Sequence, residues 1–241
     1  MRFIRENNPP EALIRCLALR RKAGQALDYD EVGQVEVNGE MLSVTTEIRK
    51  ARIADQGGIC AYTMMRIGES TCHNEHLVPR SVSKNDGKVD QTLDYRNIVA
   101  CYPQREDTGG CGFGAAARGI KKLEVTPLDS TCEQRIRFDR ASGRVESANP
   151  CDTAITELLD DVLILNHENL IARRLEAFER VGISVRCREP ISENQALTLA
   201  ATIVDHRRGR NLTPFCVAIA HAAVSHADLI AKRRRQRGGR N

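Results

Sequence analysis

The chain lacks tryptophan, and only 4% of its 241 residues are aromatic. Its core must therefore be built from Leu, Ile, Val and Ala, within a hydrophobic share of 41%. No apolar run approaches the ~18 residues of a membrane-spanning helix. The opening MRFIRENNPPEALIRC also lacks the apolar segment of a secretory signal. The sequence therefore predicts a cytoplasmic protein that is not attached to a membrane.

Closely spaced cysteine pairs are also missing, which argues against a disulfide-rich scaffold. There are nine cysteines, an odd number, spread over the chain. Single cysteines in amphipathic stretches are interpreted as small buried hydrophobes: Cys16, Cys132, Cys151, Cys187 and Cys216. The remaining four surround one central motif: Cys60, Cys72, Cys101 and Cys111.

Basic residues are concentrated at the end of the chain. The net charge is +4, and the last eleven residues, AKRRRQRGGRN, contain six Lys or Arg and no acid. Repulsion between these charges, together with Gly238 and Gly239, predicts disorder at the end of this tail. Two interpretations stay open: a solvated tail, or a nonspecific phosphate anchor whose binding depends strongly on salt.

The central motif is NEHLVP, in which Glu75 precedes His76 and Pro79 follows. Asn97 lies 21 residues beyond His76, in the run RNIVAC. A carboxylate is a suitable ligand for a divalent cation, and an imidazole titrates near neutral pH and can activate water. An amide can hold the motif loop or orient the imidazole. This combination predicts metal-dependent hydrolysis of a phosphodiester.

The surrounding pattern predicts an α+β protein with a central ββα-metal module. Strands are expected over 59–66 and 71–78, a polar loop over 81–94, a strand near 97–102 and a helix starting near 111. Helices over 11–23 and 45–56 flank a hairpin or loop at 28–44. A hairpin over 136–147 precedes four helices. The expected organisation is a helical arm (1–56), the metal module (57–125) and a hairpin with a helical region (126–241).

These motifs resemble those of the HNH endonucleases, and more narrowly the PtuB type of Septu-like and retron-linked antiphage systems. CAYT, NEHLVP, NIVAC and CGFGAAARGIKK follow one another in the order seen in that family. MRFIRENNPPEAL, LLDDVLILNHENLIARRLEAF and PFCVAIA resemble its flanking segments. The resemblance covers most of the chain, but only the central motifs are specific.

The resemblance implies roles for individual residues. His76 matches the general base, Glu75 the acidic metal ligand and Asn97 the middle Asn of the family's name. The third ligand, usually a His or Asn near the last helix, has no match in GFGAAARGIKK. Its candidate substitutes are His73, Glu106 and Asp107, with His73 first because alternate residues of a strand share a face.

Many members of the family also hold a structural zinc ion with two cysteine pairs. The first pair is broken here, because Thr63 stands where a second thiolate is expected. A zinc site would have to use Cys60, Cys101 and Cys111 with either Cys72 or His73. If His73 binds zinc, it cannot also serve the catalytic ion.

The function expected from these features is Mg²⁺- or Mn²⁺-dependent hydrolysis of DNA. Arg118, Lys121 and Lys122, on the helix beside the site, are the expected contacts to the nucleic acid. The resemblance implies antiphage defence beside a regulatory ATPase partner of the PtuA type. Two alternatives stay open: an RNA-directed nuclease, for example one that cuts tRNA, and a zinc-stabilised adaptor whose nuclease site has decayed.

Overall fold

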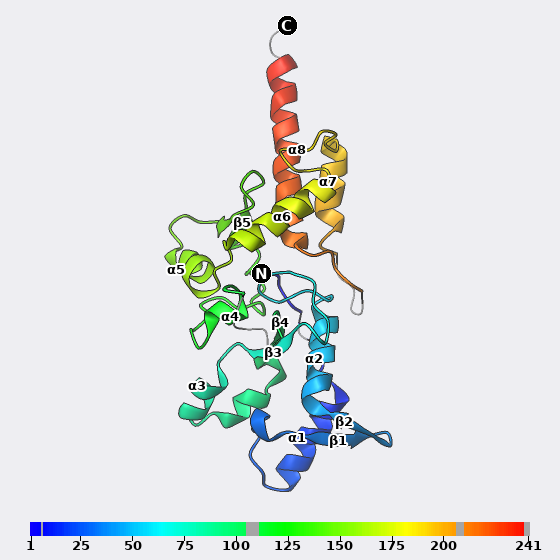
Figure 1. The fold of residues 1–241 in the computed structure, drawn as a ribbon, viewed down its shortest axis with the longest axis vertical. Helices are drawn as coiled ribbons and strands as arrows, with labels where there is room; N and C mark the ends of the chain where they lie inside the picture. The colour runs from blue at the N-terminus through cyan, green and yellow to red at the C-terminus, as the bar shows by residue number, and fades with distance from the viewer. Residues whose placement is uncertain (6, 105–110, 206–209, 239–241) are drawn as a thin grey trace.

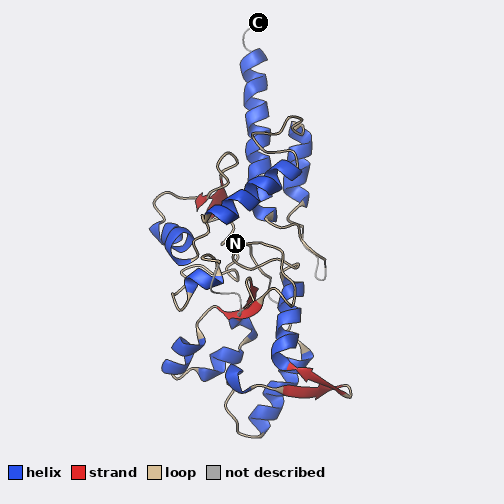
Figure 2. Ribbon diagram, in the orientation of Figure 1, coloured by secondary structure: helices blue, strands red, loops and turns tan. Residues whose placement is uncertain are grey.

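The computed structural model describes residues 1–5, 7–104, 111–205 and 210–238. Within them the fold is α+β: helices surround three antiparallel sheets of two strands each. Figure 1 places the central strands between an N-terminal half, which holds α1 and α2, and a helical half, which holds α6, α7 and α8. Figure 2 shows how short the strands are, and side-chain packing rather than an extended sheet therefore holds the fold together.

The N-terminal elements match the sequence-based expectation. Helix α1 (Glu11–Lys22) precedes a hairpin, which α2 (Val44–Asp55) follows. The hairpin pairs β1 (Gln34–Val37) with β2 (Glu40–Ser43). Its turn residues Asn38 and Gly39 have φ of 52° and 84°, and this left-handed backbone is the one that two-residue hairpin turns require. The predicted helical arm thus consists of two helices with a hairpin between them.

The central strands differ in part from the prediction. β3 (His73–His76) forms as expected but pairs with β4 (Ile98–Cys101), while the strand expected over 59–66 is absent. The Cys60 amide donates to the Met65 carbonyl and the Met64 amide to the Cys60 carbonyl, closing a tight turn. Met64 has a φ of 61°, outside strand geometry. Apolar composition alone did not distinguish this buried turn from a strand.

Two further segments were predicted incorrectly. The polar loop expected over 81–94 contains helix α3 (Arg80–Asn85) and a 3₁₀ turn at Val89–Leu93. The helix expected from 111 is the short α4 (Ala115–Arg118). It ends at Gly119, whose φ of 56° is left-handed, and Lys121 and Lys122 therefore lie beyond it.

The C-terminal region contains the predicted hairpin and a helical assembly. β5 (Ile136–Phe138) pairs with β6 (Val145–Ser147). The helical elements that follow are α5 (Thr153–Glu157), a π-helical turn (Leu158–Val162), α6 (Glu168–Arg180), α7 (Glu193–Thr202) and α8 (Cys216–Gly238). Helix α8 packs on α7 and α6 and then extends past them (Figure 1).

The basic tail forms the end of α8. Residues 231–238 are helical, including Gly238, which was expected to resist ordering. Residues 239–241, the rest of the end for which disorder is predicted, lie outside the described part. Arg234 makes an ion pair with Glu193 at 3.2 Å. In the part of the chain that the structure describes, no helix is long and apolar enough to cross a membrane.

Buried side chains form two cores. The smaller core joins α1, the β1–β2 hairpin and α2 to Leu93, Tyr95 and Ile98. The larger core joins residues from 59–77 and 99–101 with the β5–β6 hairpin and the C-terminal helices. The neighbouring strand residues Ile98 and Val99 belong to different cores. β4 is therefore held from both sides, which fixes the strand that pairs with the motif.

Gly143, in the turn of the second hairpin, is expected to resist substitution. A Cβ atom here would lie 2.9 Å from Cγ of Leu175 and 3.1 Å from the Ile171 carbonyl, and φ is +72°. We expect Gly143→Ala to lower the free energy of unfolding by roughly 1–3 kcal/mol through strain and overpacking. Gly39→Ala is the control in urea denaturation, because Gly39 also has a positive φ but open space around it. Equal losses in the two variants would contradict the packing argument.

Candidate active site

β3 presents the motif residues on alternating sides of a two-stranded ribbon. His73 lies opposite Cys101, Glu75 opposite Val99 and His76 opposite Ile98. His73 and Glu75 share one side, as strand alternation predicts, and their side chains meet there: Nε2 of His73 is 3.2 Å from Oε2 of Glu75. This contact agrees with the strand alternation for which His73 is ranked first among the candidates for the third metal ligand, and that role stays a prediction.

The contact between His73 and Glu75 requires a positive charge. Nδ1 of His73 lies 2.5 Å from the Pro103 carbonyl oxygen, which only accepts hydrogen bonds, so Nδ1 carries hydrogen. In a neutral ring the lone pair of Nε2 would then face a carboxylate oxygen. Burial opposes the imidazolium, but Glu75 and Pro103 favour it, and the pKa of His73 is raised overall. A proton, or a metal ion in its place, therefore belongs between these two atoms.

Arg118 holds the other oxygen of Glu75. Its guanidinium is fully buried and donates to Oε1 of Glu75 at 2.7 Å. It also donates to the carbonyl oxygens of His76, Leu77 and Lys121 and to the Tyr62 hydroxyl. This burial does not fit the contact to nucleic acid predicted from the sequence. Arg118 fixes the carboxylate and the backbone after β3.

His76 is buried, and its ring is oriented by a backbone carbonyl. Nε2 lies 2.9 Å from the Thr92 carbonyl oxygen and therefore carries hydrogen. The neutral ring then has its lone pair on Nδ1, the nitrogen that would accept a proton. The Tyr29 ring packs against the imidazole in a T-shaped contact, with centroids 4.7 Å apart and planes at 88°. Both contacts hold the imidazole in one orientation, which a general base needs in order to react.

Asn97 closes the loop that follows the motif. Its side chain accepts a hydrogen bond from the Val78 amide at 2.7 Å and donates to the Val78 carbonyl at 3.1 Å and the Gln91 carbonyl at 3.0 Å. Of the two roles considered from sequence, these bonds match the first, holding the loop. Thr92, whose carbonyl orients His76, directly follows Gln91. Asn97 thus positions the imidazole indirectly.

Asn97→Ala is expected to lower the unfolding free energy by roughly 1–3 kcal/mol, because partly buried backbone groups lose their partners. It should also lower any His76-dependent activity. Asn166→Ala is a matched control, since Asn166 likewise bonds both backbone groups of one residue, Val145. We expect similar stability losses in urea denaturation, with loss of activity only for Asn97→Ala. Wild-type activity in Asn97→Ala would contradict the positioning role.

The motif residues open into one pocket of about 400 Å³. Glu75 and His76, which strand alternation would separate, both line it at the end of β3 where the chain turns at Pro79. Its other walls include Asp30, Arg80 and Lys84. A carboxylate, an oriented imidazole and cations therefore face the same space. These are the groups that hydrolysis of a phosphate ester uses.

The four central cysteines are not brought together as a group. Cys60 and Cys101 are in contact, whereas the Cys111 thiol donates to the Phe113 carbonyl at 3.2 Å. Burial opposes a thiolate at Cys60, but hydrogen bonds from Cys101, Thr63 and the Tyr102 amide lower its pKa to about 6. Burial raises the pKa of Cys72 to about 11. Structural zinc at these thiols stays a prediction.

A complete set of metal ligands is not assembled either. Among the described residues, no three His, Cys, Asp or Glu side chains are grouped so that they could hold a metal ion. Glu106 and Asp107, candidates for the third ligand, lie outside the described residues. His73 and Glu75 are the two candidate ligands that lie together.

The two predicted lysines lie apart from the pocket lining. Nζ of Lys121 donates to the Asp161 carbonyl at 2.8 Å. Lys122 is 82% exposed and pairs with Glu124 at 3.1 Å. The cations that line the pocket, Arg80 and Lys84, were missed from sequence. Their spacing of four residues directly after Pro79 was the available signal, but the segment was taken for a loop.

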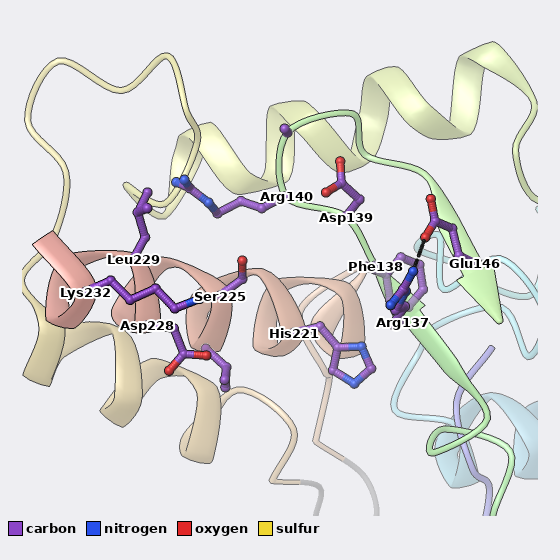
Figure 3. Close-up of a pocket in the computed structure, with 12 residues that line it drawn as sticks. Arg137, Phe138, Asp139, Arg140, Glu146, His221, Ser225, Asp228, Leu229 and Lys232 are labelled. Carbon is purple, nitrogen blue, oxygen red and sulfur yellow. Dashed lines mark hydrogen bonds and ion pairs between the residues drawn. The ribbon is translucent and has the colours of Figure 1, made fainter. Parts of the chain in front are cut away.

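A larger pocket of about 790 Å³ lies between the β5–β6 hairpin and α8. Figure 3 shows His221 and Ser225 on α8 beside the hairpin, whose residues Phe138, Asp139 and Arg140 line the same pocket. Arg137 and Glu146 in its wall pair with each other at 2.9 Å. None of the residues predicted to be functional lines this pocket. The smaller pocket, where Glu75 and His76 meet, is the better candidate for chemistry.

Comparisons with known proteins leave the family open: no family model matches the chain, and no curated protein matches it.

Proposed function

We propose that the protein is a metal-dependent HNH endonuclease that hydrolyses DNA, with its active site in the pocket of Glu75 and His76. The proposal rests chiefly on one observation: a carboxylate and a tautomer-fixed imidazole line the same pocket. The order of β3, β4 and α4 along the chain fits a ββα-metal module. Asn97 lies where that module needs a residue to hold its loop.

The donor atoms fit a divalent cation in part. Oε2 of Glu75 and Nε2 of His73 are 3.2 Å apart, and in the neutral His73 tautomer both would be lone-pair donors. Mg²⁺ and Mn²⁺ sites commonly use few protein ligands and complete their shells with water and substrate phosphates. An imidazole ligand favours Mn²⁺ over Mg²⁺. A bound ion would supply positive charge to the phosphate and the leaving oxygen.

The residues of the chain have separate tasks in this reaction. Nδ1 of His76 takes the proton from the attacking water, because the Thr92 carbonyl keeps the hydrogen of the neutral ring on Nε2. Arg118 holds Oε1 of Glu75 and leaves Oε2 for the ion. Asn97 keeps the loop, and with it the Thr92 carbonyl, in place.

Cleavage of plasmid DNA tests the proposal. Wild-type protein should nick supercoiled plasmid with Mn²⁺ or Mg²⁺ and lose this activity in EDTA or as Glu75→Gln. A parallel incubation with tRNA identifies the substrate, since the same groups could act on RNA. Equal background cleavage by wild type and Glu75→Gln on both substrates, with and without metal, would contradict the proposal.

A zinc-stabilised adaptor without activity is the second candidate. The ion pair between Glu75 and Arg118 favours it, because a guanidinium partly neutralises the proposed metal ligand. Metal analysis after purification separates the two: the adaptor should retain zinc and bind no Mn²⁺ at Glu75.

A role in antiphage defence with a PtuA-type ATPase partner rests on the sequence resemblance. Co-purification with the product of an adjacent ATPase gene tests this partner. Recovery of the two proteins separately, after expression together, would contradict it.

A further inference from the structure

Two cations of helix α3 line the same pocket as Glu75 and His76. Arg80 and Lys84 are four residues apart and therefore share a helix face. Their side chains are 19% and 36% exposed. They directly follow the motif, so their distance from the candidate catalytic groups is fixed by the short segment through Pro79.

Both cations are held by carboxylates from the N-terminal arm. Nζ of Lys84 lies 2.6 Å from Oδ2 of Asp28 and 2.8 Å from Oδ2 of Asp30, and Arg80 forms an ion pair with Asp30. Asp30 is 47% exposed. A carboxylate offers two anionic oxygens, as a phosphodiester does. The pair between Lys84 and Asp30, whose side chains are 36% and 47% exposed, is one that contributes little stability, so a polyanion can replace Asp30 there.

The turn that carries these carboxylates is anchored to the site. Tyr29, between Asp28 and Asp30, donates its amide to the Thr92 hydroxyl at 3.0 Å. Its own hydroxyl accepts from Asn74 at 2.8 Å. The Asp28 side chain caps the turn by accepting from the Asp30 amide at 3.0 Å. The Asp30 carboxylate, in contrast, takes part in none of these three hydrogen bonds, so they remain when it is substituted or displaced.

We infer that Arg80 and Lys84 form the phosphate-binding subsite of the pocket, which Asp30 occupies until a nucleic-acid backbone displaces it. This deepens the proposed function and rests on it. The subsite binds the sugar–phosphate backbone beside the bond to be cut, which places a phosphate next to Glu75 and His76. Lys121 and Lys122 do not line the pocket, and Arg118 is buried. The nucleic-acid contacts expected of these three residues from the sequence therefore pass to the cations of α3.

Binding measured without metal tests the subsite independently of cleavage. Fluorescence anisotropy in EDTA is used with a short labelled DNA duplex and an RNA of the same sequence, over a series of salt concentrations. Arg80→Gln and Lys84→Gln should each weaken binding to the duplex and reduce the slope of log K against log salt by about 0.9. Asp30→Asn should bind about three- to fivefold more tightly, as expected when an exposed ion pair is removed.

Lys122→Gln is the control, because it removes an equal charge outside the pocket. Its salt slope should equal that of wild type, and circular dichroism should show every variant folded. If the same substitutions change the salt slope for RNA in place of the DNA duplex, the result would support the subsite and identify RNA as the substrate. Wild-type slopes for Arg80→Gln and Lys84→Gln, or unchanged affinity in Asp30→Asn, would overturn the inference. Because no cleavage is measured, an inactive wild type that shows these shifts would contradict the proposed function alone.

Discussion

Replacing His76 by alanine is expected to reduce metal-dependent cleavage of DNA by roughly 10²–10⁴-fold, the range that a positioned general base contributes. The structure gives the reason in two contacts. The Thr92 carbonyl fixes the hydrogen on Nε2, and the Tyr29 ring limits rotation of the imidazole. The measurement is the initial rate of plasmid nicking at saturating Mn²⁺.

The control for this substitution is His221→Ala. His221 is an imidazole on α8, outside the pocket that Glu75 and His76 line, and packs near Phe138. Its variant should cleave at the wild-type rate. A folded His76→Ala protein that cleaves at a rate close to wild type would contradict the role of His76 as the general base.

Arg118→Met is expected to be the most destabilising of the substitutions considered, with a loss of roughly 3–5 kcal/mol in the free energy of unfolding. The substitution removes the guanidinium partner of the partly buried Glu75 carboxylate and leaves only His73 beside it. It also deprives the carbonyl oxygens of His76, Leu77 and Lys121 of a buried donor. Urea denaturation followed by circular dichroism measures the loss.

Arg137→Met provides the comparison. Arg137 pairs with Glu146 at the surface, with side chains 59% and 43% exposed, and such pairs contribute about 0–1 kcal/mol. Addition of Glu75→Gln to Arg118→Met should recover part of the lost stability, because the carboxylate that lost its guanidinium partner is then gone. If Arg118→Met were no more destabilising than Arg137→Met, the buried guanidinium would not be what holds the motif.

Local sequence patterns predicted the elements with strong local signals. The Asn38–Gly39 turn, the helix before Gly57 and Gly58, and the strand at 73–76 all follow from residue-specific backbone preferences. The alternation that puts His73 beside Glu75 has the same origin. These predictions required only short-range information.

The errors arose where long-range packing decides the conformation. The turn within 59–66 is as apolar as a strand, and it is buried because the larger core surrounds it. Arg118 looked like a surface cation, because nothing local indicates that Glu75 and Tyr62 surround it. Tyr29, which packs on His76, and Asp30, which lines the pocket, come from another part of the chain, and no spacing rule connects them to the motif.

The most direct test of the central claim is a calorimetric titration of metal-free protein with Mn²⁺. The account predicts a single Mn²⁺ site per chain, bound by His73 and Glu75, with affinity strongly reduced in both His73→Ala and Glu75→Gln. Glu146→Gln, which changes a surface carboxylate outside the pocket, should bind Mn²⁺ as wild type does. No binding by wild-type protein, or equal binding by all four proteins, would contradict a metal-dependent active site at this pocket.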